Sequence, residues 1–515
     1  MRKIAGKIGV SKSSVQRHKK AIISRQCFPE SEFWETEAGI NWLMRMYVAV
    51  LLEFGINCGV GADQISRFFK RIRIDQHIGV SASSNRKRMQ LIEKALIEYQ
   101  RSHEEIAKNS GKEIEIVGSG DETFFGEIMM LVLMDLRSGY ILLEETAEDR
   151  TYDTWQMKAK KRLNELGISV RHFVSDRAKA LIKLAADGFG CHAGADLFHA
   201  KYDLTKWFGL ALHRRLNKAR TALSKSNQEQ NALEPSQVKN EQPEYETYKQ
   251  ELQALENHQK TYKTIMQGIS DAVHPFSTQS STPLTGAQVE ISLNTKADEL
   301  ENMAEKINIL DSDAVLNSFR RQIESLSSHV YAWWLWVGES LVDKDANLDT
   351  QDWVRNSLLP TAYWLQHLDK CQNADQKKPY EILLKNAQTK LAAHPVTLKL
   401  TSSDREEWTC WAEWMATNFQ RASSAVEGRN GRLSQLYHNG RGITSQRLSA
   451  LTTLHNFDQQ RRDGSSAAER LFDTKFPDVF EWLLEQMDVN DLPLPRRRNK
   501  RDQPPNPLIP LIVPS

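Results

Sequence analysis

The 515-residue sequence predicts an α/β core, a mixed sheet flanked by helices, with an all-α region ahead of it and an all-α insertion within it. From about residue 112, short apolar runs alternate with amphipathic helical patterns, which is typical of such a core. Residues 1–110 and 216–400 carry mainly helical periodicity instead. We expect five segments: an N-terminal helical region (1–110), the first part of the core (111–215), the insertion (216–400), helices that close the core (401–475) and a basic tail (476–515).

The composition is that of an ordinary soluble protein, with 40% hydrophobic and 26% charged residues. No apolar run reaches the length of about 18 residues that a membrane span needs, so we expect no membrane partner. The apolar stretch LMRMYVAVLLEFGI is expected to form a buried helix. The five cysteines are scattered without a Cys-x-x-Cys pair, which favours a reducing, intracellular setting and argues against a zinc knuckle.

Positive charge is concentrated near the two ends of the sequence, although the formal net charge is only +2. Eight basic residues precede the first acid, Glu30, and five more occur in the stretch PRRRNKRD. Basic ends on a neutral body favour a polyanionic partner, because neutralised phosphates release counterions. For the C-terminal stretch, a solubilising tail is an equal alternative.

A short phrase occurs twice, as IGVSKSS at residues 8–14 and as IGVSASS at residues 78–84. In the first copy, Ala5, Gly9 and Val15 have the spacing of a helix-turn-helix, in which the glycine takes a left-handed turn. The second helix would begin at Ser11 as its cap. Its candidate DNA-contacting residues are Lys12, Gln16 and Arg17.

The second copy is expected to repeat this turn, and the stretch VGADQISRFFKRI supplies a leading amphipathic helix. Arg86, Lys87 and Arg88 follow the turn and are further candidate DNA contacts. Two such units predict a double-stranded DNA partner. The alternative is that each phrase is only a structural bend, since Gly-Val-Ser turns are common.

The core pattern predicts the order strand, hairpin, helix, strand, helix, strand. The first strand is expected to stop at Asp121, and the strand ISVRHFVSD to end at Asp176. A helix with Trp155 on its buried face should end at Gly167, and ADLFHAKYDL is a candidate for the last short strand. Two carboxylates on neighbouring strands repel each other unless a cation lies between them, and Mg²⁺ suits such a pair. The alternative is that each aspartate only caps a turn.

A third carboxylate lies much later, in FQRASSAVEGRNGRLSQLYHNGRG. Glu427 is expected at the rim of an apolar helical stripe formed by Ala422, Ala425, Val426, Leu433 and Leu436. Arg429 and Arg432 flank it, which suits a surface that a charged backbone approaches closely. We therefore expect these two arginines to contact DNA phosphates.

The motifs GDETFF, FVSDRAKAL and SSAVEGRNGRLS together resemble the three acidic motifs of DDE transposases, which have an RNase H-like core. The resemblance implies that Asp121, Asp176 and Glu427 are catalytic and bind two Mg²⁺ ions, for which Mn²⁺ can substitute. Asp121 would follow the first strand, Asp176 the fourth, and Glu427 would lie on a late helix. The separations are 55 (176 − 121) and 251 (427 − 176) residues, so the core would be interrupted by a large inserted domain.

Asp196 and His199 form an Asp-x-x-His pair that is similar to the C/D-x-x-H signature of hAT-, Mutator- and P-type transposases. The resemblance implies that this pair organises the site, and the alternative is a core histidine. In the insertion, Trp333 and Trp334 are candidates for stacking on a DNA base, although packing against the core is the favoured alternative. Polar stretches at 224–244 and 277–288 are expected to be loops or disordered.

The resemblance implies metal-dependent cleavage of DNA at transposon ends, followed by strand transfer into target DNA. The implied partners are terminal inverted repeats, target DNA and further copies of the chain, in the cytoplasm of a bacterium. One alternative is a transposase-derived DNA-binding regulator that has lost catalysis. Another is a stand-alone RNase H-like nuclease, which would cleave without joining.

Overall fold

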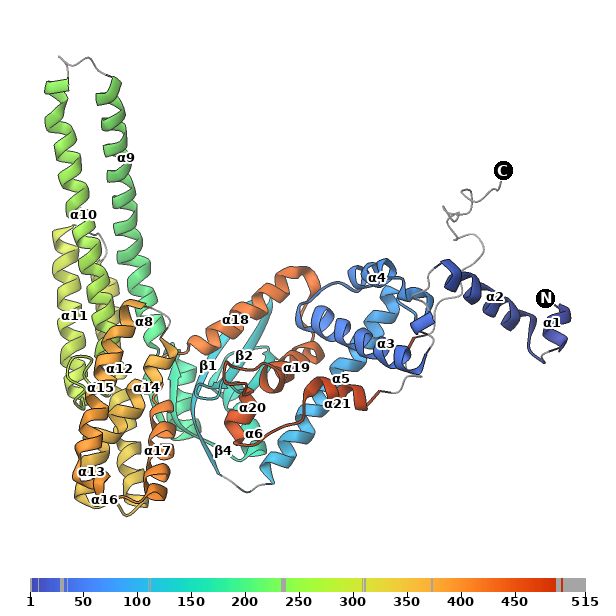
Figure 1. The fold of residues 1–515 in the computed structure, drawn as a ribbon. Coiled ribbons are helices and arrows are strands. Elements are labelled where there is room, and N and C mark those ends of the chain that lie inside the picture. Colours follow the sequence, from blue (N-terminus) through green and yellow to red (C-terminus); the bar gives the residue numbers. More distant parts are fainter. Residues whose placement is uncertain are drawn as a thin grey trace. The chain divides into compact units, whose positions relative to one another are not determined.

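The computed structural model describes residues 2–7, 9–27, 32–34, 36–109, 111, 113–232, 238–307, 309, 312–371, 374–487 and 492–493. The chain divides into two compact units (Figure 1). The helical unit comprises residues 1–110 and 432–515, and the sheet unit comprises residues 111–431. The sequence had led us to expect residues 401–475 with the core, whereas the structure groups those from 432 onward with the N-terminal region.

The first copy of the repeated phrase forms two helices joined by a turn, α1 (Arg2–Lys7) and α2 (Lys12–Cys27). Gly9 has a φ of 64°, and Val10 N donates to Ala5 O at 3.1 Å. Ser11 Oγ accepts from Ser14 N at 3.1 Å and so caps α2, as predicted. The predicted turn and the helix after it are therefore present, and the short helix α1 of six residues precedes them.

The second copy does not repeat that turn, so this part of the prediction is wrong. The leading helix α4 (Ala62–Arg71) is followed by a 3₁₀ turn, η3 (Ile74–Gln76), before α5 (Ala82–Lys108) begins. Because of this inserted turn, the left-handed residue is Arg73, with a φ of 63°, and Gly79 has no positive φ. Ser81 still caps α5 by accepting from Ser84 N at 3.1 Å.

The apolar stretch near the start forms α3 (Glu37–Ala49), which continues as the π-helix η2 (Val50–Asn57) and is largely buried, as predicted. Within the described part of the chain, Glu37–Asn57 is the one helix whose length and composition would allow it to cross a membrane, and over half of it is buried. Buried core helices have the same properties. The rest of the helical unit consists of η7 (Tyr437–Arg441), α19 (Ser445–Thr453), η8 (Leu454–Asp458), α20 (Ala467–Phe472) and α21 (Val479–Glu485).

Residues 454–485 complete the core of the helical unit. The fully buried Tyr99 of α5 contacts the rings of Phe457 and Trp482, with centroids 5.4 and 5.2 Å away. Its hydroxyl donates to the carbonyl oxygen of Pro477. These contacts explain why the late helices group with α5.

The sheet unit contains the predicted mixed sheet, whose strand order is β3-β2-β1-β4-β5. Its strands are β1 (Ile114–Phe125), β2 (Ile128–Asp135), β3 (Ile141–Ala147), β4 (Ile168–Ser175) and β5 (His192–Ala195). The first three strands form an antiparallel meander, while β4 and β5 run parallel to β1. The coarse α/β prediction is therefore confirmed.

Two details of the strand prediction are wrong. Asp121 lies within β1 and not at its end, because pairing with β2 extends the strand to Phe125 and sets Asp121 opposite Val132. The segment ADLFHAKYDL is not a strand, since β5 ends at Ala195 and α8 (Leu197–Leu204) follows at once. Asp196 caps this helix by accepting from Phe198 N at 2.9 Å.

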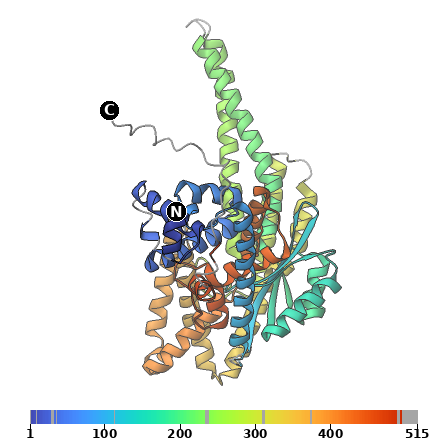
Figure 2. The same cartoon turned by 90° about the vertical axis from the view of Figure 1, so that its right-hand side faces the viewer.

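Helices cover both faces of the sheet. One face packs against α6 (Tyr152–Leu166), α7 (Lys179–Lys183) and η4 (Leu184–Phe189), and Figure 2 shows these teal helices beside the strands. Trp155 is fully buried there, and Gly167 ends α6 with a φ of 67°, as predicted. On the other face, Val117, Val132 and Val174 join an apolar core with α8 and the insertion helices.

The described residues of the insertion are helical apart from its connections, as predicted for residues 216–400. Its elements, with the flanking ones, are η5 (Thr205–Gly209), α9 (Leu210–Ala232), α10 (Val238–Ala272), α11 (Gly286–Lys306), α12 (Ser312–Asp343), α13 (Leu348–Trp353), η6 (Val354–Leu358), α14 (Leu359–Lys370), α15 (Ala374–Ala393), α16 (Pro395–Lys399), α17 (Ser402–Thr417) and α18 (Ser424–Leu436). The expected loop at 277–288 is confirmed up to the start of α11. The expected loop at 224–244 is wrong for residues 224–232 and 238–244, which continue α9 and begin α10.

Gly120 is required by the packing of β1 against the helices behind it. A Cβ atom at this position would lie 2.9 Å from Phe173 Cζ and 3.5 Å from the Trp155 ring, and both rings are fully buried. We expect Gly120→Ala to lower the free energy of unfolding by about 1–3 kcal/mol, because neither ring can move away. Urea denaturation measures this. The control is Gly428→Ala, which meets nothing within 4 Å on its helix and should be neutral or slightly stabilising.

Candidate active site

The pairing of β1 with β4 brings Asp121 and Asp176 to the same level of the sheet. Ser119 of β1 pairs with Val174 of β4 in parallel register. Asp121 and Asp176 each lie two residues further along, so they fall side by side on the face that Ser119 and Val174 share. Asp176 follows β4 directly, as predicted, and its Oδ1 accepts from Ala178 N at 2.9 Å.

A buried carboxylate, Asp196, connects the end of β5 to the beginning of α18. Asp196 Oδ1 accepts from Ser423 N at 3.0 Å, and Oδ2 accepts from Ser423 Oγ at 2.6 Å. The same Oδ2 contacts His199 Nδ1, one turn along α8. Asp196 therefore determines where α18 starts and how the imidazole of His199 is oriented.

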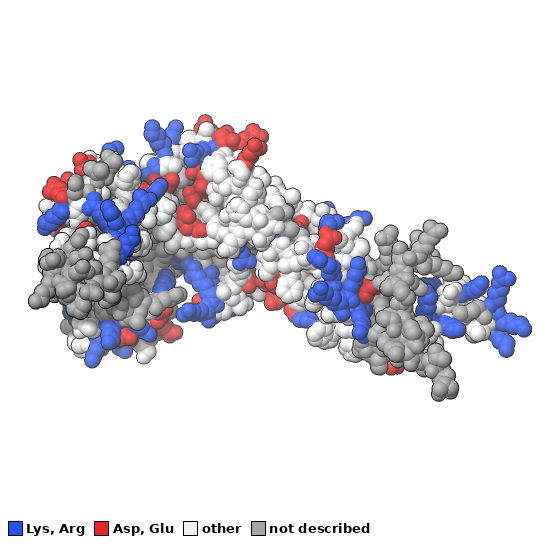
Figure 3. All heavy atoms as spheres, turned by 90° about the horizontal axis from the view of Figure 1, so that it is seen from above, with Lys and Arg blue, Asp and Glu red and all other residues white. Residues whose placement is uncertain are grey.

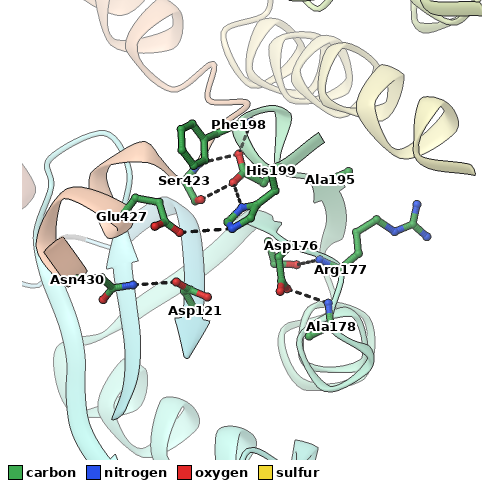
Figure 4. A network of polar contacts seen from close by, with 12 residues as sticks. Asp121, Asp176, Arg177, Ala178, Ala195, Phe198, His199, Ser423, Glu427 and Asn430 are labelled. Atoms are coloured by element: carbon green, nitrogen blue, oxygen red, sulfur yellow. Dashed lines mark hydrogen bonds and ion pairs between the residues drawn. The ribbon is translucent and has the colours of Figure 1, made fainter. Parts of the chain in front are cut away.

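The three acids face one space. In Figure 4 the carboxylates of Asp121, Asp176 and Glu427 point toward a common region. The imidazole of His199 projects into it, with Nε2 3.5 Å from Glu427 Oε1. On the other side, Asn430 Nδ2 donates to Asp121 Oδ2 at 2.8 Å. His199 is about one-third exposed, which argues against the alternative of a core histidine.

The electrostatics of this space are dominated by negative charge. Burial, and the neighbouring carboxylates of Glu427 and Asp176, raise the pKa of Asp121 from 3.8 to about 7. The hydrogen bond to Asp196 raises the pKa of His199 from 6.5 to about 9. Burial acts to raise the pKa of Asp196, but the hydrogen bonds from His199 and Ser423 outweigh it and lower that pKa.

The donor set fits a divalent cation of the Mg²⁺ type. Hard cations prefer carboxylate oxygens, and the three acids offer such oxygens around one space. Within the described residues, no group of three or more His, Cys, Asp and Glu side chains is already arranged as a metal cage. A metal bound here would therefore require the three carboxylates to move closer together.

Arg429 does not have the predicted role. Its side chain is only 1% exposed and forms a two-pronged ion pair with the buried Glu144 of β3, at 2.7 and 2.6 Å. The prediction that Arg429 holds a phosphate is wrong, because Glu144 already neutralises its charge inside the protein.

Ala425 is exposed and not part of the buried stripe. Arg432 lies in the helical unit and donates to Asn57 Oδ1.

The two candidate tryptophans are packing residues. Trp333 is buried, and its ring N–H donates to Met415 O at 3.0 Å. Trp334 is half-buried, donates to Leu284 O at 2.9 Å and packs edge-on against Trp333. The alternative, a tryptophan-rich helix packed against the core, is confirmed for this pair.

The predicted DNA contacts of the helical unit differ in their surroundings. Lys12, Gln16 and Arg17 are exposed on α2, and Figure 3 shows basic side chains at its right-hand end, over α1 and α2. No acidic residue occurs in either helix. In α5, Lys87 is exposed, Arg86 forms an ion pair with Asp63 at 2.9 Å, and Arg88 is half-buried.

Three residues that build the site were given no role from the sequence: Glu144, Ser423 and Asn430. A signal existed for Asn430, which lies three residues after Glu427 on the same helical face. Glu144 interrupts the apolar run ILLEET, and an acid inside a buried strand needs a partner. No pattern in the sequence pointed to Ser423, because its partner Asp196 is 227 residues away.

The Arg429–Glu144 pair should be essential for stability. We expect Arg429→Met to lower the free energy of unfolding by about 3–5 kcal/mol, because it removes the cation that neutralises the buried Glu144. The control is Lys158→Met, which breaks the neighbouring pair with the exposed Glu145 and should cost about 1 kcal/mol or less. Adding Glu144→Met to Arg429→Met should recover part of the loss in urea denaturation. If the double variant regained no stability, the explanation by the buried Glu144 charge without Arg429 would be contradicted.

The pKa of Asp121 predicts a pH dependence of stability in metal-free buffer. Between about pH 4 and pH 7 the folded protein keeps a proton on Asp121 that the unfolded chain has released, so this group's contribution to the free energy of unfolding falls as pH rises. Asp121→Asn removes that titration. As pH rises over this range, the free energy of unfolding of the variant should therefore decline less than that of the wild-type protein. Urea titrations of both proteins at several pH values measure the difference. If the wild-type protein became more stable relative to the variant as pH rises, the raised pKa of Asp121 would be contradicted.

Residues 354–501 match the model of DUF6399, a family of unknown function. The match covers the segment that carries Glu427, Arg429 and Asn430, and it does not reach β1, β4 or α8. A search of the curated proteins finds no match for the chain.

Proposed function

We propose that this protein is a DNA transposase that cleaves DNA at transposon ends and transfers the strand into target DNA, with Asp121, Asp176 and Glu427 as its catalytic acids. The observation that carries the proposal is that three carboxylates, 55 and 251 residues apart in sequence, surround one space beside β1 and the end of β4. A fold gains no stability from such a concentration of negative charge. It is expected where a cation and a phosphate backbone are to be bound.

The arrangement of elements agrees with what the resemblance implies. Asp176 follows the fourth strand, and Glu427 lies on a late helix after a long helical insertion. The mixed sheet with β1 at its centre is compatible with an RNase H-like core. Asp121 lies inside the first strand and not after it, but it is level with Asp176.

In this proposal Asp121, Asp176 and Glu427 hold two Mg²⁺ ions, or Mn²⁺ in their place. Bound divalent ions would supply the positive charge that the attacking and leaving oxygens of a phosphodiester require. Asp196 orients the ring of His199, so that its Nε2 faces Glu427 and the incoming phosphate. Asn430 holds Asp121 in its rotamer through one hydrogen bond.

The helical unit supports a DNA partner. The basic helix α2, with exposed Lys12, Gln16 and Arg17, suits binding in a DNA groove, and Lys87 adds an exposed charge on α5. Double-stranded terminal repeats and target DNA are the proposed partners. Two transposon ends processed together would require at least a dimer, in the cytoplasm of a bacterium.

Cleavage tests the proposal. Purified protein with DNA that carries the ends of its element should cut in Mg²⁺ or Mn²⁺ and stop when a chelator is added. Glu427→Gln keeps the size of the side chain but removes its charge, so the cleavage rate should fall on the order of a hundredfold or more. Asp121→Asn and Asp176→Asn should lower the cleavage rate in the same way. All three variants should still bind DNA.

The matched control is Glu413→Gln, an exposed glutamate on α17, which should cut at the wild-type rate. Cleavage that continues undiminished in chelator would contradict the metal-dependent site. DNA binding by the wild-type protein without any cleavage would favour the regulator instead. Cleavage without strand joining would favour the nuclease.

A further inference from the structure

A continuous helical segment, α8 with η5 and α9, carries an unusual exposed face. Its buried face repeats every four residues, at Ala200, Leu204, Phe208, Leu212 and Leu216. The opposite face repeats with the same spacing, at Phe198, Tyr202, Lys206, Leu210 and Arg214, and all five side chains are exposed. We call these five residues the α8–α9 stripe.

The π-helical segment keeps the stripe straight. In an α-helix, residues spaced by four drift around the axis by about 40° at each step, so a long row would wind out of one face. The wider turns of η5 offset this drift in the middle of the segment. Phe198 and Leu210 therefore remain on the same side across three turns.

The stripe begins at the candidate active site. Phe198 directly precedes His199, and the two rings lie edge to face with centroids 5.6 Å apart. Phe198 and Tyr202 lie nearly parallel, with an interplanar angle of 19°, and are 43% and 54% exposed. Trp207 and Leu210 continue the apolar surface at 44% and 49% exposure. Single exposed apolar side chains are common, but a row that leads away from a site indicates a ligand.

The charge on the segment indicates the kind of ligand. Residues 197–225 contain seven basic residues (Lys201, Lys206, Arg214, Arg215, Lys218, Arg220 and Lys225) and one acid, Asp203. Lys201 donates to Ser270 Oγ and Arg220 forms an ion pair with Glu256, whereas Lys206, Arg214 and Lys218 are exposed. The ligand must therefore offer flat apolar faces and regularly spaced negative charges. A DNA strand with unpaired bases has both.

We propose that the α8–α9 stripe binds an unpaired stretch of the DNA strand next to the cut, with bases stacked on Phe198 and Tyr202 and phosphates near Lys206 and Arg214. Bases inside a duplex are stacked on each other and cannot reach a side-chain ring, so the bound stretch must be single-stranded or frayed. The link to the cut rests on the proposed function. Binding of a single DNA strand by the stripe does not rest on the proposed function.

Fluorescence anisotropy of labelled DNA with the full-length protein in chelator tests the stripe. The probes are a single strand of mixed sequence and the matching blunt duplex. Phe198→Leu with Tyr202→Leu keeps apolar bulk but removes both rings, so affinity for the single strand should fall roughly ten- to a hundredfold. Affinity for the duplex should change by less than about twofold, since its bases are already stacked.

Two controls separate stacking from general surface effects. Tyr202→Phe keeps the ring and should retain wild-type binding of the single strand. Tyr331→Leu removes an equally exposed ring on α12, at 54%, and should have no effect. Lys206→Ala and Arg214→Ala should each lower the slope of log affinity against log salt by about 0.7 for the single strand.

Wild-type affinity for the single strand in the double leucine variant would overturn the stripe proposal, as would an equal loss in Tyr331→Leu. A change only in self-association of the leucine variant would also overturn it, since the stripe would then be a protein contact. Cleavage by the wild-type protein in Mg²⁺ is scored separately. If that cleavage is absent while the leucine variant still loses the single strand, the proposed function fails and the binding site stands.

Discussion

The candidate site depends on one buried carboxylate, Asp196, which joins segments that lie 227 residues apart. Its two oxygens accept from the backbone and side chain of Ser423, cap α8 through Phe198 N and contact the ring of His199. A buried carboxylate without these donors would destabilise the fold. The hydrogen bonds together therefore fix the positions of Asp196 and its partners. Because α18 begins one residue after Ser423, this contact determines where Glu427 meets the sheet.

Helix α18 has a second attachment on its other side. Arg429 and Glu144 form an ion pair inside the protein, and Asn430 reaches Asp121 one residue later. Within four residues the helix therefore provides one proposed catalytic acid and two anchors. Asp121 remains the least stabilised charge in this arrangement, because burial and two other acids raise its pKa. The attachments of α18 thus lie next to the unbalanced charge of Asp121 on β1, and only that charge calls for a ligand.

The helix that starts at Asp196 also connects the site to the insertion. Its first turn orients His199, and its exposed face carries Phe198 and Tyr202. The same helix then continues through η5 into α9, whose buried face packs in the core of the sheet unit. A DNA strand held along this face would be positioned by the same element that orients the imidazole. In this view the insertion extends the proposed binding surface, while its tryptophans hold the helices together.

Local pattern in the sequence determined several of the elements near the site. Periodicity and turn residues identified the hairpin, the helix that ends at Gly167 and the strand before Asp176, because these depend on neighbours within a few residues. Three further features depended on tertiary pairing: β1 extends beyond Asp121 because β2 pairs with it, Arg429 is buried because Glu144 lies opposite, and residues 454–485 pack on Tyr99. Each partner is distant in sequence or hidden in an apolar run. A charged residue on a helix looks the same in sequence whether it faces water or a buried acid, and only the folded chain decides between them.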